Sequence, residues 1–201
     1  VVGASNRRAD GKAGLLAHLK AIGAEIRAQN LDIVVLNEVD FASSWSWRIN
    51  QAEVIAEAAG LPFVLEQRSY DCSLLFYKWE FGNAVLSRYP ISDAELVDYP
   101  AFNGREALLF GKKSGVTCTV ESPLGELRVV AVHLEVRDES TRAGSVEMLL
   151  GLEAERPGMP HLIMGDFNQQ EVFVGAPRLR SAGGRGLPVP STTPNRRSDW
   201  I

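Results

Sequence analysis

The chain has 201 residues, of which 45% are hydrophobic and 23% charged, a composition typical of one globular domain. It has no apolar run long enough to span a membrane, and its net charge of −4 argues against a protein that coats nucleic acid by charge alone. An acidic protein can still bind phosphate groups through metal ions, which supply the positive charge. The chain shows no signal-peptide pattern and does not begin with methionine, so we expect a mature form or a fragment.

Apolar periodicity predicts two helices and several strands in the first half of the chain. Residues 1–6 are expected to form a short strand that ends in asparagine, and residues 10–29 have the spacing of an amphipathic helix. The continuous apolar run at 31–40 predicts a strand buried on both faces. Residues 49–60 predict a second helix, closed by a glycine cap. Further strands are predicted at 62–67, 72–79 and 83–89.

In the second half, the turn SPLGE predicts a hairpin between strands at 115–122 and 127–135. A third helix is predicted at 139–155, with Ser140 or Thr141 as its N-cap. Hairpin-linked strands and helix-linked strands together predict a single α/β or α+β domain built in layers. The remaining predicted elements are strands at 107–113 and 161–165 and a loop over 171–197.

The two cysteines, Cys72 and Cys118, form neither a disulfide framework nor a metal-ligand pattern. Both lie in apolar runs typical of strands. We therefore expect both to be buried free thiols.

Three predicted strands end in polar side chains. In layered α/β folds, ligand sites gather where strand ends meet, so these side chains are expected to converge on one cleft. Carboxylate and amide oxygens suit Mg²⁺ or Mn²⁺, and a histidine beside such a metal can donate to a phosphate oxygen. The sequence has no zinc-binding Cys/His cluster, no P-loop and no Gly-x-Ser-x-Gly motif. The strand-end pairs are Asn37 and Glu38, His133 and Glu135, and Asp166 and Asn168.

Each of these groups also has a purely structural interpretation. The segment GDFN, which contains Asp166, could be an ordinary turn, because Gly, Asp and Asn are common turn residues. Glu38 could form a surface salt bridge, and His133 could be a core histidine with its hydrogen bonds satisfied.

Five segments, taken in order, resemble the endonuclease/exonuclease/phosphatase superfamily of metal-dependent phosphoesterases. The resemblance covers nearly the whole chain, with Asn37 at a position where the family usually has glutamine. It implies a DNase I-like, four-layer sandwich of two mixed β-sheets flanked by helices, as a single domain over residues 1–201. The segments are DIVVLNEVD, GNAVLSRYPI, VVAVHLE, LIMGDFN and TTPNRRSDWI.

The resemblance also implies a mechanism, in which a water activated by Mg²⁺ or Mn²⁺ attacks phosphorus. Glu38 would be the main metal ligand, helped by Asn6. Asp166 would position or deprotonate the water, and Asn168 would bind a phosphate oxygen or orient Asp166. His133 would stabilise the charged phosphate.

The last matching segment would supply Asp199, which in the family orients a catalytic histidine. That histidine belongs to a Ser-Asp-His element that normally follows, and the chain stops at Ile201. We therefore expect a domain truncated at its C-terminus, without the last strand and the histidine. The alternative is a catalytically impaired binding domain of the same fold.

Four further residues are predicted to contact the substrate. The first choice of substrate is a phosphodiester, ahead of a monoester, within a nucleic acid, a phospholipid head group or a small metabolite. Phe41, Trp45 and Trp47 follow Glu38 and could pack in the core or stack on a base or sugar. Each predicted contact also has a structural alternative. Arg48 and Asn50 could cap the second helix, Asn83 could support a turn, and Arg105 could lie on an exposed loop.

Overall fold

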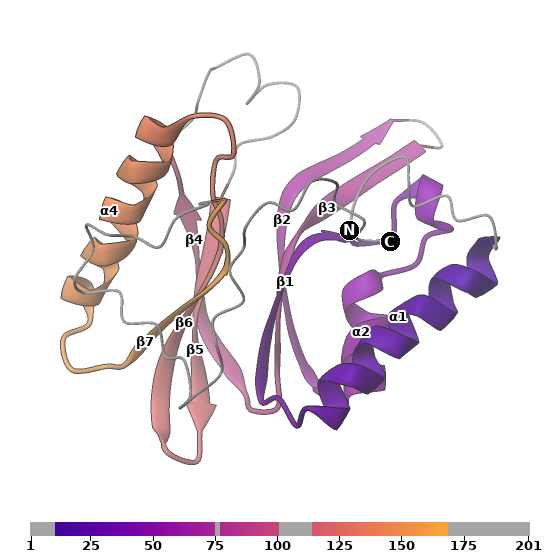
Figure 1. The fold of residues 1–201 in the computed structure, drawn as a ribbon, viewed down its shortest axis with the longest axis horizontal. Helices are drawn as coiled ribbons and strands as arrows, with labels where there is room; N and C mark the ends of the chain where they lie inside the picture. The colour runs from indigo at the N-terminus through magenta and orange to yellow at the C-terminus, as the bar shows by residue number, and fades with distance from the viewer. Residues whose placement is uncertain (1–10, 75–76, 101–113, 169–201) are drawn as a thin grey trace. The chain divides into compact units, whose positions relative to one another are not determined.

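The computed structural model describes residues 11–74, 77–100 and 114–168 of the chain (Figure 1). The strands predicted at 1–6 and 107–113 and the loop predicted at 171–197 lie outside these ranges. All the described helices and strands belong to one compact unit, which ends at Phe167. Within the described residues, no helix is long and apolar enough to cross a membrane.

The first sheet has the strand order β1-β3-β2 and is covered by two helices. The chain runs through α1 (Gly11–Ala28), β1 (Ile33–Asp40), α2 (Gln51–Ala59), β2 (Phe63–Leu74) and β3 (Tyr77–Ser87). Since β3 is antiparallel to both neighbours, β1 and β2 run in the same direction with β3 between them. Helix α2 is the crossover that returns the chain to the start of β2.

The second sheet has the strand order β4-β5-β6-β7 and contains the one parallel pair among the described strands. Its elements are β4 (Ile91–Asp98), β5 (Ser114–Ser122), β6 (Gly125–His133), α4 (Glu139–Glu155) and β7 (His161–Asp166). Strands β4, β5 and β6 form antiparallel pairs, and α4 carries the chain back so that β7 pairs with β6 in parallel.

Two apolar cores hold these layers together. One lies between α1, α2 and the outer face of the first sheet, and includes Leu19, Ile55 and Leu86. The other joins the facing sides of the two sheets, where Val85 of β3 packs with residues of β5 and β6. Helix α4 lies along the outer face of the second sheet (Figure 1). The predicted arrangement of two sheets flanked by helices is confirmed, although the first sheet is antiparallel in all its described pairs.

Most predicted elements are present, and the differences have local causes. The strands predicted at 72–79 and 83–89 are parts of one long hairpin, in which a bulge near Ser69 carries β2 through a polar stretch. Strand β4 was not predicted. Helix α2 ends at the predicted glycine cap, Gly60, with φ of 74°. The N-cap of α4 is Asp138, whose carboxylate accepts from the Thr141 amide, so the prediction of Ser140 or Thr141 was wrong.

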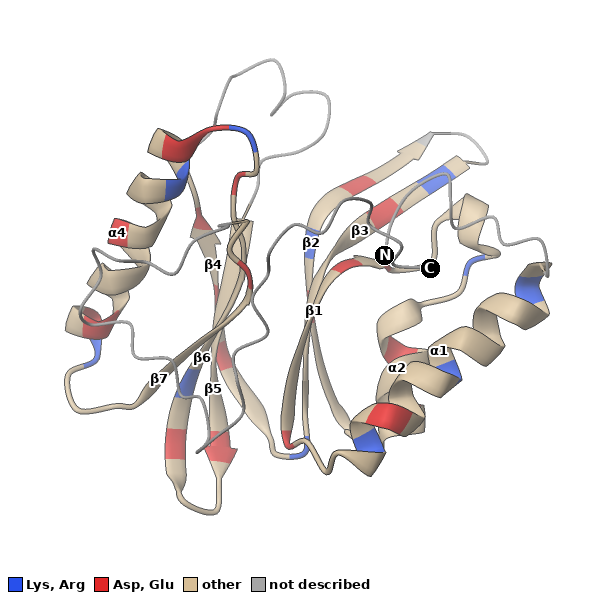
Figure 2. Cartoon of the chain, viewed as in Figure 1, with Lys and Arg blue, Asp and Glu red and all other residues tan. Residues whose placement is uncertain are grey.

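Charged residues are spread over both sheets and the helices. Figure 2 shows no continuous stripe of Lys and Arg on the described residues, in keeping with the acidic composition. In this view the Lys and Arg residues of the described ranges therefore form no continuous track along a strand or helix of the kind that follows a nucleic-acid backbone.

The cysteine prediction was right for one residue and wrong for the other. Both are free thiols, but Cys72 is exposed near the end of β2, whereas Cys118 is fully buried in β5. Burial raises the pKa of the Cys118 thiol to about 11, because the charged thiolate is poorly solvated in the core.

We expect one thiol to react quickly with a thiolate-selective reagent at pH 8 in the folded protein, and two after denaturation. The physical reason is that the thiolate is the reactive form and Cys118 is both shielded and protonated. Titration with Ellman's reagent measures this, with Cys72→Ser as the control. Fast reaction of a thiol in folded Cys72→Ser would contradict the assignment.

Candidate active site at the strand ends

The carboxamide of Asn37 links four strands at one end of the two sheets. Its Nδ2 donates to Oδ1 of Asn83 in β3 and to the carbonyl oxygen of Val132 in β6, both at 2.9 Å. Its Oδ1 accepts from the backbone N–H of Asp166 in β7 at 3.1 Å. Three good hydrogen bonds therefore use all but one of the bonds that an amide can make, and they fix the ends of β1, β3, β6 and β7 to one another.

Glu38 lies on a break in the β1–β3 ladder. The register shifts between Leu36 and Val39, and Glu38 adopts a left-handed conformation with φ of 55°. Such a conformation costs a non-glycine residue roughly 1–3 kcal/mol and persists only where its surroundings enforce it. Its result here is that the Glu38 side chain is 51% exposed, with Oε1 3.9 Å from Nε2 of His133. The bulge thus turns a carboxylate out of a buried strand.

The parallel pairing of β6 and β7 places His133 opposite Asp166. The pairing continues for one further bond, since the Leu134 N–H donates to the Asp166 carbonyl at 2.9 Å. Asp166 is exposed, whereas His133 is partly buried with 19% of its side chain exposed. Of the predicted strand-end residues, the structure thus brings Glu38 close to His133 and places Asp166 opposite His133 in the β6–β7 pair.

Gly165 allows β7 to reach this position. Its φ is 130°, and a Cβ built on it would lie 2.0 Å from the Val132 carbonyl oxygen. No side chain fits there, because both the conformation and the close approach to β6 exclude a Cβ. The glycine of the GDFN segment is thus needed for the β6–β7 contact beside Asp166.

Asn83 accepts a hydrogen bond from Asn37 and lies within a strand, so it is not part of a turn. It lies within β3 with 1% of its surface exposed, so the turn interpretation was wrong. Its amide lies 2.7 Å from that of Gln67, which in turn lies 2.8 Å from the Ser114 hydroxyl. These buried amides connect the two sheets directly beneath Asn37.

The loop after β1 is organised by Asp40, a residue that the sequence analysis did not select. Its buried carboxylate accepts from the Ser43 amide at 2.7 Å, the Ser46 hydroxyl at 2.8 Å, the Ala42 amide at 3.0 Å and the Trp45 indole N–H. The sequence does contain a signal for this network, because Asp40 is followed within six residues by serines whose amides and hydroxyls can donate to a carboxylate. The loop beside Glu38 is therefore held in a defined conformation.

The predicted substrate contacts of this loop differ in their surroundings. Asn50 caps α2, as its structural alternative proposed: Oδ1 accepts from the Glu53 amide at 3.3 Å and Nδ2 donates to Glu66 at 2.6 Å. Arg48 is exposed, with φ of 55°, and its backbone N–H donates to the Ser43 carbonyl.

Two further predicted residues, Glu135 and Asn168, lie in the described part of the chain. Glu135 is buried and accepts from the Arg137 amide at 2.9 Å. Asn168, with φ of 50°, is the first residue after the compact unit. Asn6, Arg105 and Asp199 lie outside the described residues.

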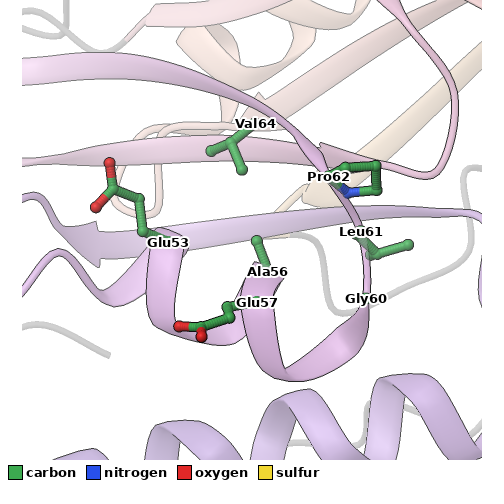
Figure 3. Close-up of a pocket in the computed structure, with 7 residues that line it drawn as sticks. All are labelled: Glu53, Ala56, Glu57, Gly60, Leu61, Pro62 and Val64. Carbon is green, nitrogen blue, oxygen red and sulfur yellow. The ribbon is translucent and has the colours of Figure 1, made fainter.

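In the described part of the chain, no group of three or more His, Cys, Asp or Glu side chains is close enough to hold a metal ion. A pocket of about 450 Å³ lies elsewhere, at the C-terminal end of α2 and the start of β2 (Figure 3). Because Ser87 pairs with both Ile33 and Phe63, this pocket lies level with the start of β1, not with Glu38 near its end. Its carboxylates, Glu53 and Glu57, are therefore separate from the candidate site.

We expect Gly165→Ala to lower the free energy of unfolding by at least about 2 kcal/mol, because the new Cβ meets the Val132 carbonyl in an unfavourable conformation. The matched control is Gly151→Ala in α4, where a Cβ meets nothing within 4 Å. That change should stabilise the helix by roughly 0.5–1 kcal/mol. Urea denaturation measures both, and equal effects would contradict the role of Gly165.

We expect Asn37→Asp to destabilise the fold by about 1–3 kcal/mol, because it replaces a donor by an oxygen that faces two other oxygens. Gln29→Ala, at an exposed position after α1, is the control and should change stability by less than about 0.5 kcal/mol. The same denaturation measurement applies. A value for Asn37→Asp equal to that of the control would show that the amide does not hold the strand ends.

Comparison with known proteins agrees with this architecture. The sequence profile of the Endonuclease/Exonuclease/phosphatase family matches residues 6–201. The uncharacterized protein YbhP of Escherichia coli K12 is 30% identical over 169 residues, which is 79% of this chain and 62% of YbhP. The chain therefore spans less than two thirds of the length of this curated relative.

Two solved structures are similar to the chain. An endonuclease/exonuclease/phosphatase from Beutenbergia cavernae is 26% identical, with a TM-score of 0.58 over 75% of this chain and 42% of that one. Staphylococcus aureus beta toxin, in a mutant form with bound magnesium ions, is 17% identical, with a TM-score of 0.57 over 79% of this chain and 59% of the toxin. The two flanked sheets are thus those of a DNase I-like fold, and the chain belongs to the endonuclease/exonuclease/phosphatase family, a family of metal-dependent phosphoesterases.

Proposed function

We propose that the chain is the phosphoesterase domain of a Mg²⁺-dependent enzyme that hydrolyses a phosphodiester at the cluster of Glu38, His133 and Asp166. The observation that carries the proposal is the strained bulge at Glu38, which exposes a carboxylate 3.9 Å from an imidazole. Backbone conformations that cost stability cluster at functional sites. The family and its phosphoester chemistry support the same reading.

The donor chemistry of the site fits Mg²⁺. This ion commonly binds through one or two carboxylates and completes its shell with water and substrate oxygens, so a single half-exposed glutamate suits it. Glu38 would hold the ion, with Asn6 as the second protein ligand; Mn²⁺ could take its place. Bound magnesium in a beta toxin of the same fold supports this choice. When bound, the ion acts as a Lewis acid and lowers the pKa of water.

The side chains around Glu38 then have distinct tasks. Asp166 orients the attacking water and accepts its proton, and Asn168 orients Asp166 or binds a phosphate oxygen. His133 donates from its ring to a phosphate oxygen on which charge develops in the transition state. Asp199 orients a histidine of the Ser-Asp-His element expected after residue 201.

The substrate is held by groups around this cluster. Arg48, exposed on the loop after Glu38, is the proposed phosphate contact, because a guanidinium can donate two parallel hydrogen bonds to phosphate oxygens. Arg105 is a second candidate for the same task. Asn83 is buried and fully engaged, so its proposed contribution is to hold Asn37, and Asn50 contributes by fixing the start of α2.

We expect Mg²⁺- and Mn²⁺-dependent hydrolysis of bis(p-nitrophenyl) phosphate that EDTA abolishes. Asp166→Ala should lower kcat by roughly 10² to 10⁴, the usual contribution of a general base. Glu38→Gln should raise the Mg²⁺ concentration needed for half-maximal rate. Glu53→Gln, which changes the same kind of side chain in the pocket of Figure 3, is the matched control and should have wild-type activity.

The assay is run with this chain and with the longest natural form that contains it. Faster hydrolysis of p-nitrophenyl phosphate than of the diester would make the enzyme a monoesterase. Absence of metal-dependent turnover in every form, on both esters, would reject the proposal in favour of a binding domain of the same fold.

A further inference from the structure

Four aromatic side chains form a packed group on the first sheet next to the proposed site. The ring centroids of Tyr70 and Trp79 are 4.6 Å apart, those of Trp45 and Trp79 are 5.3 Å apart, and Phe81 lies 5.9 Å from both Tyr70 and Trp79. Each of these residues is only partly buried. We call the group of Trp45, Tyr70, Trp79 and Phe81 the aromatic ridge.

The ridge continues the face of β3 that carries the site. Residues two apart on a strand share a face, so Val85, Asn83, Phe81 and Trp79 point to the same side of the sheet. Val85 packs against the second sheet, and Asn83 bonds to Asn37. Along the strand, Phe81 is about 7 Å and Trp79 about 13 Å beyond Asn83. The ridge therefore begins directly beside the strand ends that hold Glu38 and His133.

The exposed surface of the ridge is uncharged. The basic residues of this hairpin, Arg68 and Lys78, are both paired with the buried Glu80, at 2.7 Å and 2.6 Å. Arg68 also lies over the ring of Phe41, which belongs to the core beneath α2. The cationic groups of Arg68 and Lys78 thus contact Glu80, and that of Arg68 also contacts Phe41, on the helix-covered face. Figure 2 shows no cationic stripe along β2 and β3.

The polar edge of Trp79 also faces inward. Its Nε1 is buried and has no hydrogen-bond partner among the described residues. The part of this ring that solvent can reach therefore consists of carbon, which suits stacking or dispersion contacts with a flat apolar ligand.

We propose that the aromatic ridge is a substrate subsite that stacks the nucleobase of a phosphodiester whose phosphate lies at Glu38 and His133. This inference rests on the proposed function and names its substrate class as a nucleotide ester. Bases of every type stack on aromatic side chains, and stacking needs no charge. A long nucleic acid would require a cationic track, which the described residues lack.

A quaternary ammonium group is a poorer fit to the same rings. Such cations are bound in cages, where the rings stand around an open space and present their faces to it. Here the rings are packed against one another at 4.6 to 5.9 Å, which leaves only their outer surfaces available.

The test uses three diesters that share p-nitrophenolate as the leaving group, so that only the other substituent differs. They are thymidine 5′-monophosphate p-nitrophenyl ester, methyl p-nitrophenyl phosphate and p-nitrophenyl phosphocholine. We expect kcat/KM for the thymidine ester to exceed that for the methyl ester by about tenfold or more. Trp79→Leu should remove most of this preference and leave the methyl ester within twofold of wild type.

Two further variants distinguish loss of base stacking from a general loss of folding. Trp79→Phe retains a stacking face and should recover the preference for the thymidine ester. Phe63→Leu changes a 36% exposed aromatic residue at the other end of β2, and should leave all three rates unchanged.

Equal rates on the thymidine and methyl esters, or a preference for phosphocholine, would overturn the subsite while leaving the phosphoesterase intact. Binding to phosphatidylglycerol vesicles that Trp79→Leu abolishes, without a nucleotide preference, would likewise overturn it and make the ridge a lipid contact. Absence of metal-dependent turnover on the methyl ester would instead mark failure of the proposed function itself.

Discussion

The hydrogen bonds of one carboxamide, Asn37, determine how the two sheets meet at their polar ends. Away from the strand ends, the sheets face each other through packed apolar side chains such as Val85, Val116 and Val129. At the strand ends an amide with directional bonds joins β1 to β3, β6 and β7. A site that needs groups from different sheets at fixed separations depends on such a joint, because apolar packing alone does not set the register between layers.

The candidate site forms where regular structure is interrupted. Glu38 leaves the ladder of β1 at a bulge, and Gly165 brings β7 closer to β6 than any residue with a side chain could. Both features lower local stability, and the surrounding buried network of Asn83, Gln67 and Ser114 offsets that cost. The loop after β1 is likewise held by buried polar groups. The Asp40 carboxylate accepts hydrogen bonds from the backbone amides of Ala42 and Ser43.

The sequence predicted the layers and the strands that end in polar residues, because apolar periodicity and polar strand termini are local signals. It missed features that depend on partners far away in the chain. Nothing local distinguishes Asn83 in a buried strand from Asn83 in a turn, since the difference lies in the amides of Asn37 and Gln67. Likewise, Cys72 belongs to an apolar run but lies near the end of a hairpin whose outer part is exposed. The polar stretch before it resembled a strand break, whereas pairing with β3 carries it through a bulge.

The bond between the Asn37 side chain and the Asp166 amide joins residues 129 positions apart in the chain. During synthesis at about 5–20 residues per second, Asn37 therefore waits roughly 6 to 26 s for its partner. Until β7 has been synthesised, Asn37 beside the β1 bulge lacks its hydrogen bond from the Asp166 amide. Asp166 is then also not yet paired with His133. The strand ends of both sheets are thus joined through Asn37 only after most of the described strands have been made.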